Sequence, residues 1–269
     1  MTDLSLGVKP ITRFHWKGGQ WQQESSEVVE EMPITLFVNG DEYVTVALTP
    51  IDLRDWAVGF LAGEGLIASP ADMTIFLWQP HDGQLWVRIP GAKVVKDRGG
   101  RYLGSCCGQS RPGFFNPADT PPLTQTLAVD MARVQGAYAE LTEWSHTQHS
   151  GGLHVAGLVY DGRLLFARAD VGRHNALDKL FGAALAESDV SLSECVVLFS
   201  GRLSAEIVWK VRLMGATTIV SNAAPTSLGI SLADRLGITA IGFLREHDFS
   251  VFSHPGRLAL PGHEPTNGL

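Results

Sequence analysis

The chain has 269 residues, of which 45% are hydrophobic and 18% charged, and its formal net charge is −7. This composition is typical of a globular protein, and the acidic balance argues against broad, non-specific binding of nucleic acid. Every hydrophobic run is shorter than the ~18 residues that a membrane span needs. With three cysteines and no evident signal peptide, we expect a cytoplasmic protein with no membrane partner.

The first part of the chain predicts a small α+β unit. Residues 1–30 are polar and predict a lead-in strand or a frayed arm. Asn39 and Gly40 separate two β-rich runs, which is a strong hairpin signal. Thr49 followed by Pro50 is typical of a helix cap and the first helical residue. Strands are expected over residues 34–38, 43–48, 74–78 and 84–89.

Two adjacent cysteines, Cys106 and Cys107, lie in a Gly- and Pro-rich loop over about residues 100–122. Such a polar, flexible setting differs from that of a cysteine in a core. Arg101 and Arg111 flank the pair, and nearby positive charge favours the nucleophilic thiolate. These features are typical either of a reactive thiol or of two incidental loop residues.

The second half alternates short apolar strands with helices, which predicts an α/β sheet with helical layers. We therefore expect two domains: residues 1–125, ending in the cysteine loop, and residues 126–269. The pattern predicts helices over about residues 126–144, 173–186, 203–214 and 226–236, and strands over residues 153–160, 164–168, 195–199, 217–221 and 238–243. Gly215 and Gly237 are placed to cap two of the helices.

Polar junctions follow the strands of this second half, over residues 200–204 and 222–227. Ligands collect at the carboxyl ends of strands in α/β sheets, but Ser and Thr at such places also serve as plain helix caps. Asp170, Arg173 and His174 gather at the start of a third helix, where they indicate a ligand site. The alternatives are a structural Arg–Asp pair and a surface histidine.

The stretch after the last predicted strand is the most basic in this acidic chain and contains Arg245, His247, His254 and Arg257. It favours recognition of phosphate, with a solvated charged edge as the alternative. The sequence has no C-x-x-C pair, no H-E-x-x-H and no 2-His-1-carboxylate spacing. The run that begins at His154 also lacks the glutamate of a zinc deaminase, and the cysteine pair of that motif is absent.

Over residues 30–260 the sequence resembles the formate dehydrogenase accessory sulfurtransferase family, FdhD/NarQ. The most specific shared motif is Asp-Val-Gly-Arg-His-Asn at residues 170–175. The other matching runs are residues 31–40, 57–67, 150–154, 200–202, 224–228 and 251–257.

The resemblance implies a mixed α/β protein, with a small β-rich N-terminal subdomain and a three-layer α/β domain like the cytidine deaminase fold without zinc. It implies a sulfurtransferase that takes persulfide sulfur from a cysteine desulfurase. That sulfur would pass to the molybdenum bis-(molybdopterin guanine dinucleotide) cofactor of formate dehydrogenase. A homodimer is also implied, with no catalytic metal of its own.

By the same resemblance, Cys107 is the persulfide carrier. Many family members have Cys-Gly-x-Cys in this loop, whereas here Ser110 stands at the second cysteine position and Cys106 is an additional thiol. The resemblance also implies that one segment binds the cofactor: Phe243, Leu244, Arg245, Glu246, His247 and Asp248.

Two other functions compete with sulfur transfer. A cofactor-binding chaperone would keep the pocket but tolerate loss of both loop thiols, and the serine at position 110 favours it. A nucleotide hydrolase or deaminase on the same fold would need zinc ligands and a general acid that the sequence lacks.

Overall fold

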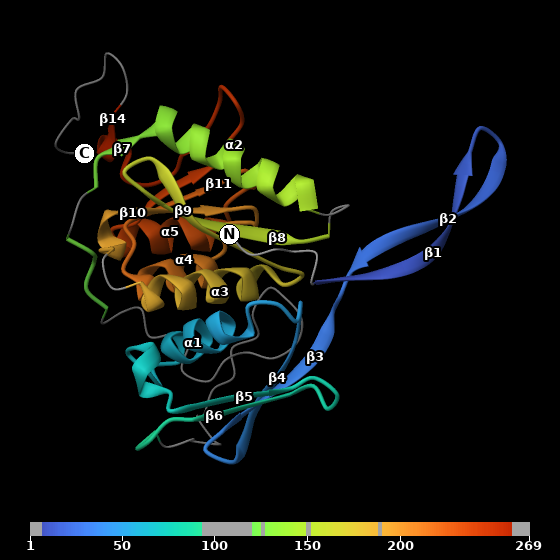
Figure 1. The fold of residues 1–269 in the computed structure, drawn as a ribbon. Coiled ribbons are helices and arrows are strands. Elements are labelled where there is room, and N and C mark those ends of the chain that lie inside the picture. The colour runs from blue at the N-terminus through green and yellow to red at the C-terminus, as the bar shows by residue number, and fades with distance from the viewer. Residues whose placement is uncertain (1–6, 93–119, 125–126, 149–151, 188–189, 260–269) are drawn as a thin grey trace.

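The computed structural model describes residues 7–92, 120–124, 127–148, 152–187 and 190–259. It is a mixed α/β structure with several sheets, which confirms the prediction of a mixed α/β fold. In Figure 1, the largest sheet lies between α2 (Met131–Gln148) on one side and three helices on the other, α3 (Arg173–Ala186), α4 (Ala205–Met214) and α5 (Ser227–Leu236). Helix α1 (Leu53–Gly63) and a second sheet lie beyond α3. The described helices include none that is long and apolar enough to cross a membrane.

The largest sheet has six strands, and its centre is buried on both faces. Strands β10, β11 and β12 are parallel, as expected for short, continuous apolar runs covered by helices. Strand β8 pairs antiparallel with β10, strand β13 pairs antiparallel with β12, and β9 pairs antiparallel with β8. In spatial order the strands are β13 (Ser250–Val251), β12 (Thr239–Gly242), β11 (Thr218–Ser221), β10 (Cys195–Phe199), β8 (His154–Tyr160) and β9 (Arg163–Asp170).

Helices cover both faces of this sheet and bury an apolar cluster on each side. Their bounds are α2 (Met131–Gln148), α3 (Arg173–Ala186), α4 (Ala205–Met214) and α5 (Ser227–Leu236). The predicted range of α3 is confirmed. Gly215 and Gly237 follow α4 and α5 in the left-handed conformation, with φ of 82° and 72°, so both predicted caps are confirmed.

The N-terminal unit is a four-stranded sheet with α1 (Leu53–Gly63) packed on one face. Its strands are, in spatial order, β4 (Asp41–Leu48), β3 (Met32–Val38), β6 (Gln84–Arg88) and β5 (Ile75–Gln79). Asn39 and Gly40 both have positive φ, 55° and 97°, so the predicted hairpin turn between β3 and β4 is confirmed.

The predicted start of the first helix is wrong. The structure begins α1 at Leu53, with Asp52 as its N-cap, rather than at Thr49 and Pro50. Thr49 is fully buried and makes tertiary hydrogen bonds: its amide donates to Asp170, and its hydroxyl accepts from the amide of Val171. These bonds to a distant segment outweigh the local tendency of Thr49 to cap a helix.

Residues 8–29 form a regular two-stranded ribbon of β1 (Val8–Lys17) and β2 (Gln20–Val29), rather than a single strand or a frayed arm. The ribbon projects from the body of the molecule (Figure 1). Two short strands, β7 (Val129–Asp130) and β14 (Leu258–Ala259), pair elsewhere and tie the last described residues to the start of α2.

The N-terminal unit and the larger sheet meet where α1 packs on α3. A Cβ atom added at Gly59 would lie 1.8 Å from the carbonyl oxygen of Asp178, and one added at Gly182 would lie 1.9 Å from that of Asp55. The two helices therefore touch backbone to backbone, which only glycine permits. The division into domains at residue 125 stays a prediction.

We expect Gly182→Ala to lower the free energy of unfolding by at least about 1–3 kcal/mol, because the new methyl group must push the helices apart. Gly136→Ala is the matched control, since that glycine lies in α2 with nothing within 4 Å of an added Cβ. The control should gain about 0.5–1 kcal/mol from helix propensity. Chemical denaturation measures both, and equal effects would contradict the close packing of α1 on α3.

Candidate functional site

One edge of the six-stranded sheet collects the polar segments that the sequence singles out. The parallel strands β10, β11 and β12 all end there and are followed by Ser200, Asn222 and Phe243. Strand β8 runs antiparallel to β10, so its first residue, His154, starts at the same edge and pairs with Asp170. Ligands of open α/β sheets bind outside the carboxyl ends of strands, which makes this edge the candidate site.

Hydrogen bonds of the Ser221 hydroxyl and of the backbone hold together the loops that follow the first two of these strands. The Ser221 hydroxyl donates to the carbonyl oxygen of Gly201 at 2.8 Å and accepts from the amide of Ala223 at 3.0 Å. Two backbone hydrogen bonds join the same two loops: the amide of Leu203 donates to the carbonyl oxygen of Ala224, and the amide of Thr226 donates to the carbonyl oxygen of Leu203. The edge is thus a rigid frame.

Capping explains one of the two predicted junctions. The Thr226 hydroxyl accepts a hydrogen bond from the amide of Gly229 at 3.1 Å and so caps α5. This is the plain capping role that the sequence offered as the alternative to a ligand site. At the other junction the side chain of Ser204 does not cap α4, and Ser200 instead accepts the amide hydrogen of Val155 at 2.9 Å. Arg202 is exposed.

The shared motif at residues 170–175 has two separate roles in the structure. Asp170 adjoins the start of α3, as predicted, but it is fully buried, so its side chain is not accessible to a ligand there. One of its carboxylate oxygens accepts from the amide of Gly172 at 2.7 Å and from Asn175 Nδ2 at 3.1 Å, and the other accepts from the amide of Thr49 at 3.0 Å. The aspartate thus organises the chain around it.

Lys179 is the charged partner of this buried carboxylate. Its Nζ lies 2.7 Å from Asp170 Oδ2 and donates to the carbonyl oxygens of Thr49 at 2.9 Å and Ala169 at 3.2 Å. Burial lowers the pKa of Lys179, while the attraction of Asp170 raises it. The pair joins the end of β4 to the start of α3, so it connects the N-terminal unit to the candidate site.

Arg173 and His174, the middle residues of the motif, remain at the edge and are half-buried. His174 Nε2 lies 2.8 Å from Glu206 Oε2 of α4. His154 Nδ1 lies 3.4 Å from the hydroxyl oxygen of Ser200. Two imidazoles, a guanidinium and a carboxylate therefore gather where β8, α3 and α4 begin.

Both imidazoles are poised to stay neutral at pH 7. Burial lowers the pKa of His154, and the positive charge of Arg173 lowers it further. Burial also lowers the pKa of His174, although the hydrogen bond with Glu206 opposes this change. Neutral imidazoles can accept protons or donate hydrogen bonds to an anion.

The predicted cofactor segment forms a turn beside this edge. Phe243 is exposed and has a φ of 55°, whereas the Leu244 side chain is buried in the core and anchors the turn. Arg245 donates from Nη1 to the carbonyl oxygen of Asn222 at 2.8 Å. Gln135 of α2 supports the turn by donating to the carbonyl oxygens of Arg245 and Glu246.

The rest of this segment points outward. Glu246, His247 and Asp248 are exposed, and the turn closes through a 2.7 Å hydrogen bond from the amide of Arg245 to the carbonyl oxygen of Asp248. Five of the six predicted side chains are thus accessible from outside. The predicted carrier, Cys107, lies outside the described residues.

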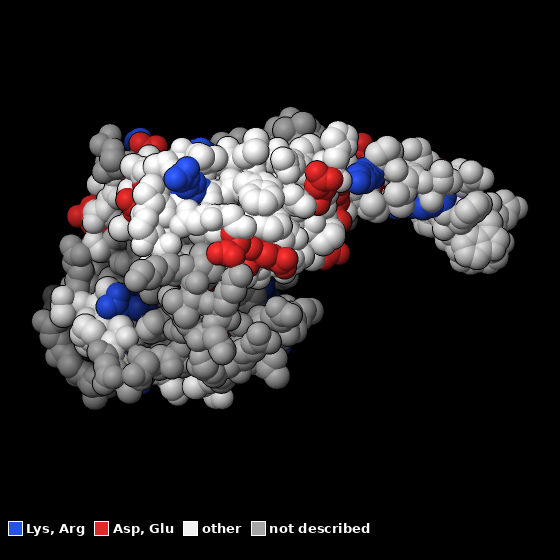
Figure 2. Space-filling model, turned by 90° about the horizontal axis from the view of Figure 1, so that it is seen from below, with Lys and Arg blue, Asp and Glu red and all other residues white. Residues whose placement is uncertain are grey.

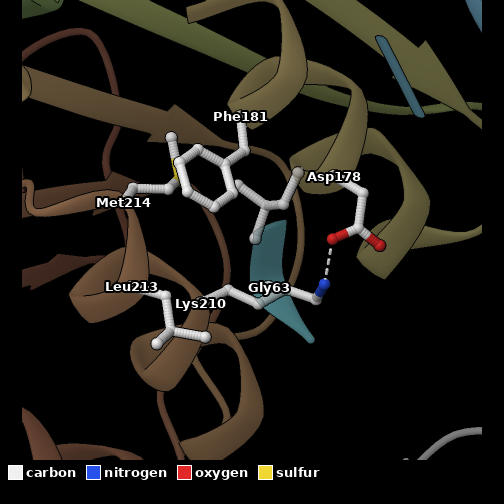
Figure 3. A pocket seen from close by; sticks show the side chains of 7 residues that line it. Gly63, Asp178, Phe181, Lys210, Leu213 and Met214 are labelled. Atoms are coloured by element: carbon white, nitrogen blue, oxygen red, sulfur yellow. Dashed lines mark hydrogen bonds and ion pairs between the residues drawn. The ribbon is translucent and has the colours of Figure 1, made fainter. Parts of the chain in front are cut away.

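A second polar feature lies between α1, α3 and α4 and is not a ligand site. Asp178 and Lys210 form a buried ion pair there, beside Gly63, Phe181, Leu213 and Met214 (Figure 3). The hollow has no room for a water molecule. Within the described part of the chain, no group of three or more His, Cys, Asp or Glu side chains could hold a metal ion.

Three partners found in the structure carry no signal in the sequence: Glu206 and Lys179, which contact the motif, and Lys210, which pairs with Asp178. Glu206 lies in the first turn of α4, where an acidic residue is ordinary and carries no special signal. The two lysines look like solvent-facing helix residues in the sequence, and only the packing of α3 buries them.

We expect Arg173→Ala to raise the pKa of both His154 and His174, because it removes a positive charge that disfavours their protonated forms. Burial should still keep both values below the ordinary histidine value. Arg202→Ala removes an exposed charge from the same edge and should leave both unchanged. NMR titration of the imidazole protons measures this, and equal responses to the two variants would contradict the described cluster.

Comparison with known proteins identifies the family. Residues 29–259 match the model of the FdhD/NarQ family. The chain is 36% identical to the sulfur carrier protein FdhD of Geobacillus kaustophilus, over 97% of this chain and 100% of that protein. It is 35% identical to the protein of the same name from Bacillus subtilis, over 96% of this chain and 99% of the relative.

A solved structure agrees with this assignment. The crystal structure of a protein from Desulfotalea psychrophila, described as a formate dehydrogenase accessory protein, superimposes with a TM-score of 0.73 at 26% identity. The match covers 94% of this chain and 99% of that one. On the family match and the full-length relatives, the chain belongs to the FdhD/NarQ family.

Proposed function

We propose that this protein is a sulfur carrier that serves formate dehydrogenase. In this proposal it accepts persulfide sulfur from a cysteine desulfurase in the cytoplasm and passes it to the molybdenum bis-(molybdopterin guanine dinucleotide) cofactor. The observation that carries the proposal is the near full-length similarity to proteins named as sulfur carriers, together with the three arginines, Arg173, Arg202 and Arg245, along the edge of the six-stranded sheet.

Cys107 is the proposed carrier of sulfur. Its thiolate attacks the outer sulfur of the desulfurase persulfide, the S–S bond of the donor breaks, and the donor cysteine leaves as a thiolate. This exchange needs no external electrons. In the second step the outer sulfur becomes a ligand of molybdenum, the reduced metal supplies the electron pair, and Cys107 returns to a thiolate.

The remaining cysteine is unsuited to this chemistry. Cys195 is fully buried in β10, and burial raises the pKa of its thiol to about 11. It therefore stays protonated at neutral pH and cannot meet a partner protein. This leaves Cys106 and Cys107 as the two thiols that a carrier mechanism can use.

The edge of the sheet is the proposed place of the cofactor. A dinucleotide with pyrophosphate groups calls for cationic side chains and free amide donors, and Arg173, Arg202 and Arg245 lie along this edge. The exposed ring of Phe243 offers a surface on which a flat base or pterin can stack.

The second candidate is a cofactor-binding chaperone that does not transfer sulfur. One observation favours it: Ser110 stands where many family members have a second cysteine. The two candidates share the binding edge and differ in whether a loop thiol is required.

We expect Cys107→Ala to abolish formate dehydrogenase activity in the host, because no persulfide can form on that residue. The purified variant should keep the unfolding midpoint of the wild type, and Cys195→Ala should retain activity. Formate-dependent dye reduction in extracts of complemented cells measures this. Normal activity of the Cys107→Ala variant would favour the chaperone.

We also expect Arg245→Ala to weaken binding of the cofactor, by roughly tenfold or more if one charged hydrogen bond is lost. Persulfide loading should be unaffected. Arg235→Ala is the matched control, because this exposed arginine lies in the last turn of α5. Titration with guanosine diphosphate, as the terminal part of the cofactor, measures the affinity, and equal affinities in the two variants would remove Arg245 from the site.

A further inference from the structure

Strand β5 lies at an open edge of the N-terminal sheet. It pairs with β6 on one side, and on its other side no strand of the described part of the chain pairs with it. In an antiparallel pair, every second residue of an edge strand directs its amide and carbonyl groups outward. The sequence of β5, Ile-Phe-Leu-Trp-Gln, lacks the charged residues and prolines that commonly protect such edges. An edge of this kind can accept a further strand.

The other edge strands of the two larger sheets are protected in the usual ways. On β4, at the opposite edge of the same sheet, Asp41 and Glu42 are charged, and a register shift interrupts the pairing with β3. In the six-stranded sheet, β9 carries two arginines and an aspartate, and β13 has only two residues. Among these edges, as far as the chain is described, β5 alone is both uncharged and long enough to pair.

The exposed face of the sheet beside this edge is apolar. Phe37, Trp86 and Leu77 are neighbours across β3, β6 and β5, because the register pairs Trp86 with both of the others. The rings of Phe37 and Trp86 stack with centroids 4.0 Å apart, whereas Leu77 and Ile75 remain 49% and 48% exposed. Figure 2 shows the molecule from below, the side of this sheet in Figure 1, and a broad area there carries no charged side chain. A docked strand would continue this apolar row.

A hollow of about 540 Å³ adjoins the start of β5. It is lined by the turn between β3 and β4, by Ile75, Trp86 and Arg88, and by the segment after β6. Asn39 holds that segment, because its side-chain amide donates to the carbonyl oxygen of Ile89 at 2.9 Å and its side-chain oxygen accepts from the amide of Ile89 at 2.8 Å. The hollow is thus built into the end of the sheet and offers room for a side chain of a docked segment.

Two arginines lie on the two faces of the sheet beside this edge. The guanidinium carbon of Arg54 in α1 lies 5.6 Å from the centre of the Phe76 ring, on the face that packs on α1. Arg88 of β6 lies opposite Ile75 and belongs to the other face. Both arginines are exposed, and neither forms an ion pair with a carboxylate among the residues that the structure describes. A cation on each face of an uncharged edge favours carboxylates in whatever binds there.

We propose that β5 is the docking site for an extended segment of a partner protein, which joins the sheet as an additional strand. The segment has apolar side chains at alternate positions, over Ile75 and Leu77, and carboxylates that meet Arg54 on one face and Arg88 on the other. Main-chain hydrogen bonds supply affinity, and the apolar row, the hollow and the two arginines supply specificity. A second copy of β5 is a poorer occupant, because its five residues include no carboxylate.

The place of this edge suits a partner of the sulfur-transfer reaction. Strand β5 pairs with β6, and after that strand the chain continues through Ala92 toward Cys107. A protein docked on β5 is therefore held beside the point where the segment with the proposed carrier begins. This role of the partner rests on the proposed function, whereas the docking itself does not.

Fluorescence polarisation of a labelled peptide with the full-length protein tests the proposal. The probe Glu-Thr-Val-Glu-Val-Thr-Glu, labelled at its N-terminus and amidated, reads the same in both directions and so fits either strand polarity. We expect a dissociation constant on the order of 10 µM. N-methylation of the three central residues removes donors to the strand edge and should weaken binding by roughly tenfold or more, as should replacement of every glutamate by lysine.

Variants of the two arginines test the charge complementarity. Arg54→Glu and Arg88→Glu should each raise the dissociation constant by roughly tenfold or more. Arg163→Glu is the matched control, because this exposed arginine lies on the edge strand β9 of the other sheet, and it should leave the constant unchanged. Far-UV circular dichroism should show that all three variants stay folded. Cys107→Ala should bind the probe like wild type, which separates the docking from sulfur transfer.

Three results would overturn the proposal. The first is no binding to wild type at peptide concentrations up to about 1 mM. The second is equal binding of the N-methylated probe, or equal weakening by Arg163→Glu, because the strand edge or the two arginines would then play no specific part. The third is tighter binding of a peptide with the sequence of β5 itself, which would indicate self-pairing of this edge.

Discussion

The fully buried ion pair between Lys179 and Asp170 is the interaction on which the rest of the structure depends. It brings Thr49, which directly follows β4, together with the end of β9 and with α3. Breaking such a pair by removing one partner costs about 3–5 kcal/mol, because the other charge stays buried. The glycine contact between α1 and α3 lies beside it, so one junction fixes the N-terminal unit against the larger sheet.

This junction also explains why the motif at residues 170–175 contains both buried residues and residues at the accessible edge of the sheet. Asp170 and Asn175 face inward and hold the backbone around Gly172, while Arg173 and His174 are left at the sheet edge. The buried members set the direction of α3. The edge members then meet His154, Ser200 and Glu206 from other elements. A frame of this kind keeps the charged groups in place when no ligand is bound.

Local signals in the sequence predicted much of the fold but not its tertiary polar contacts. The turn at Asn39–Gly40, the helix over residues 173–186 and the glycine caps follow from short-range backbone preferences. Thr49 failed as a helix cap because its bonding partners lie more than 120 residues away. The hydrogen bond between His174 and Glu206 and the burial of Lys179 depend on how the helices pack, which periodicity alone cannot reveal. Family resemblance, rather than pattern, supplied the roles of Cys107 and of residues 243–248.

The central functional claim is that Cys107 carries sulfur as a persulfide. The most direct measurement is intact mass spectrometry after incubation with a cysteine desulfurase and cysteine, on wild type and on the Cys106→Ser and Cys107→Ser variants. The account predicts a gain of one sulfur atom that dithiothreitol reverses and that only Cys107→Ser loses. No gain in wild type, with a desulfurase that loads a known acceptor, would contradict it.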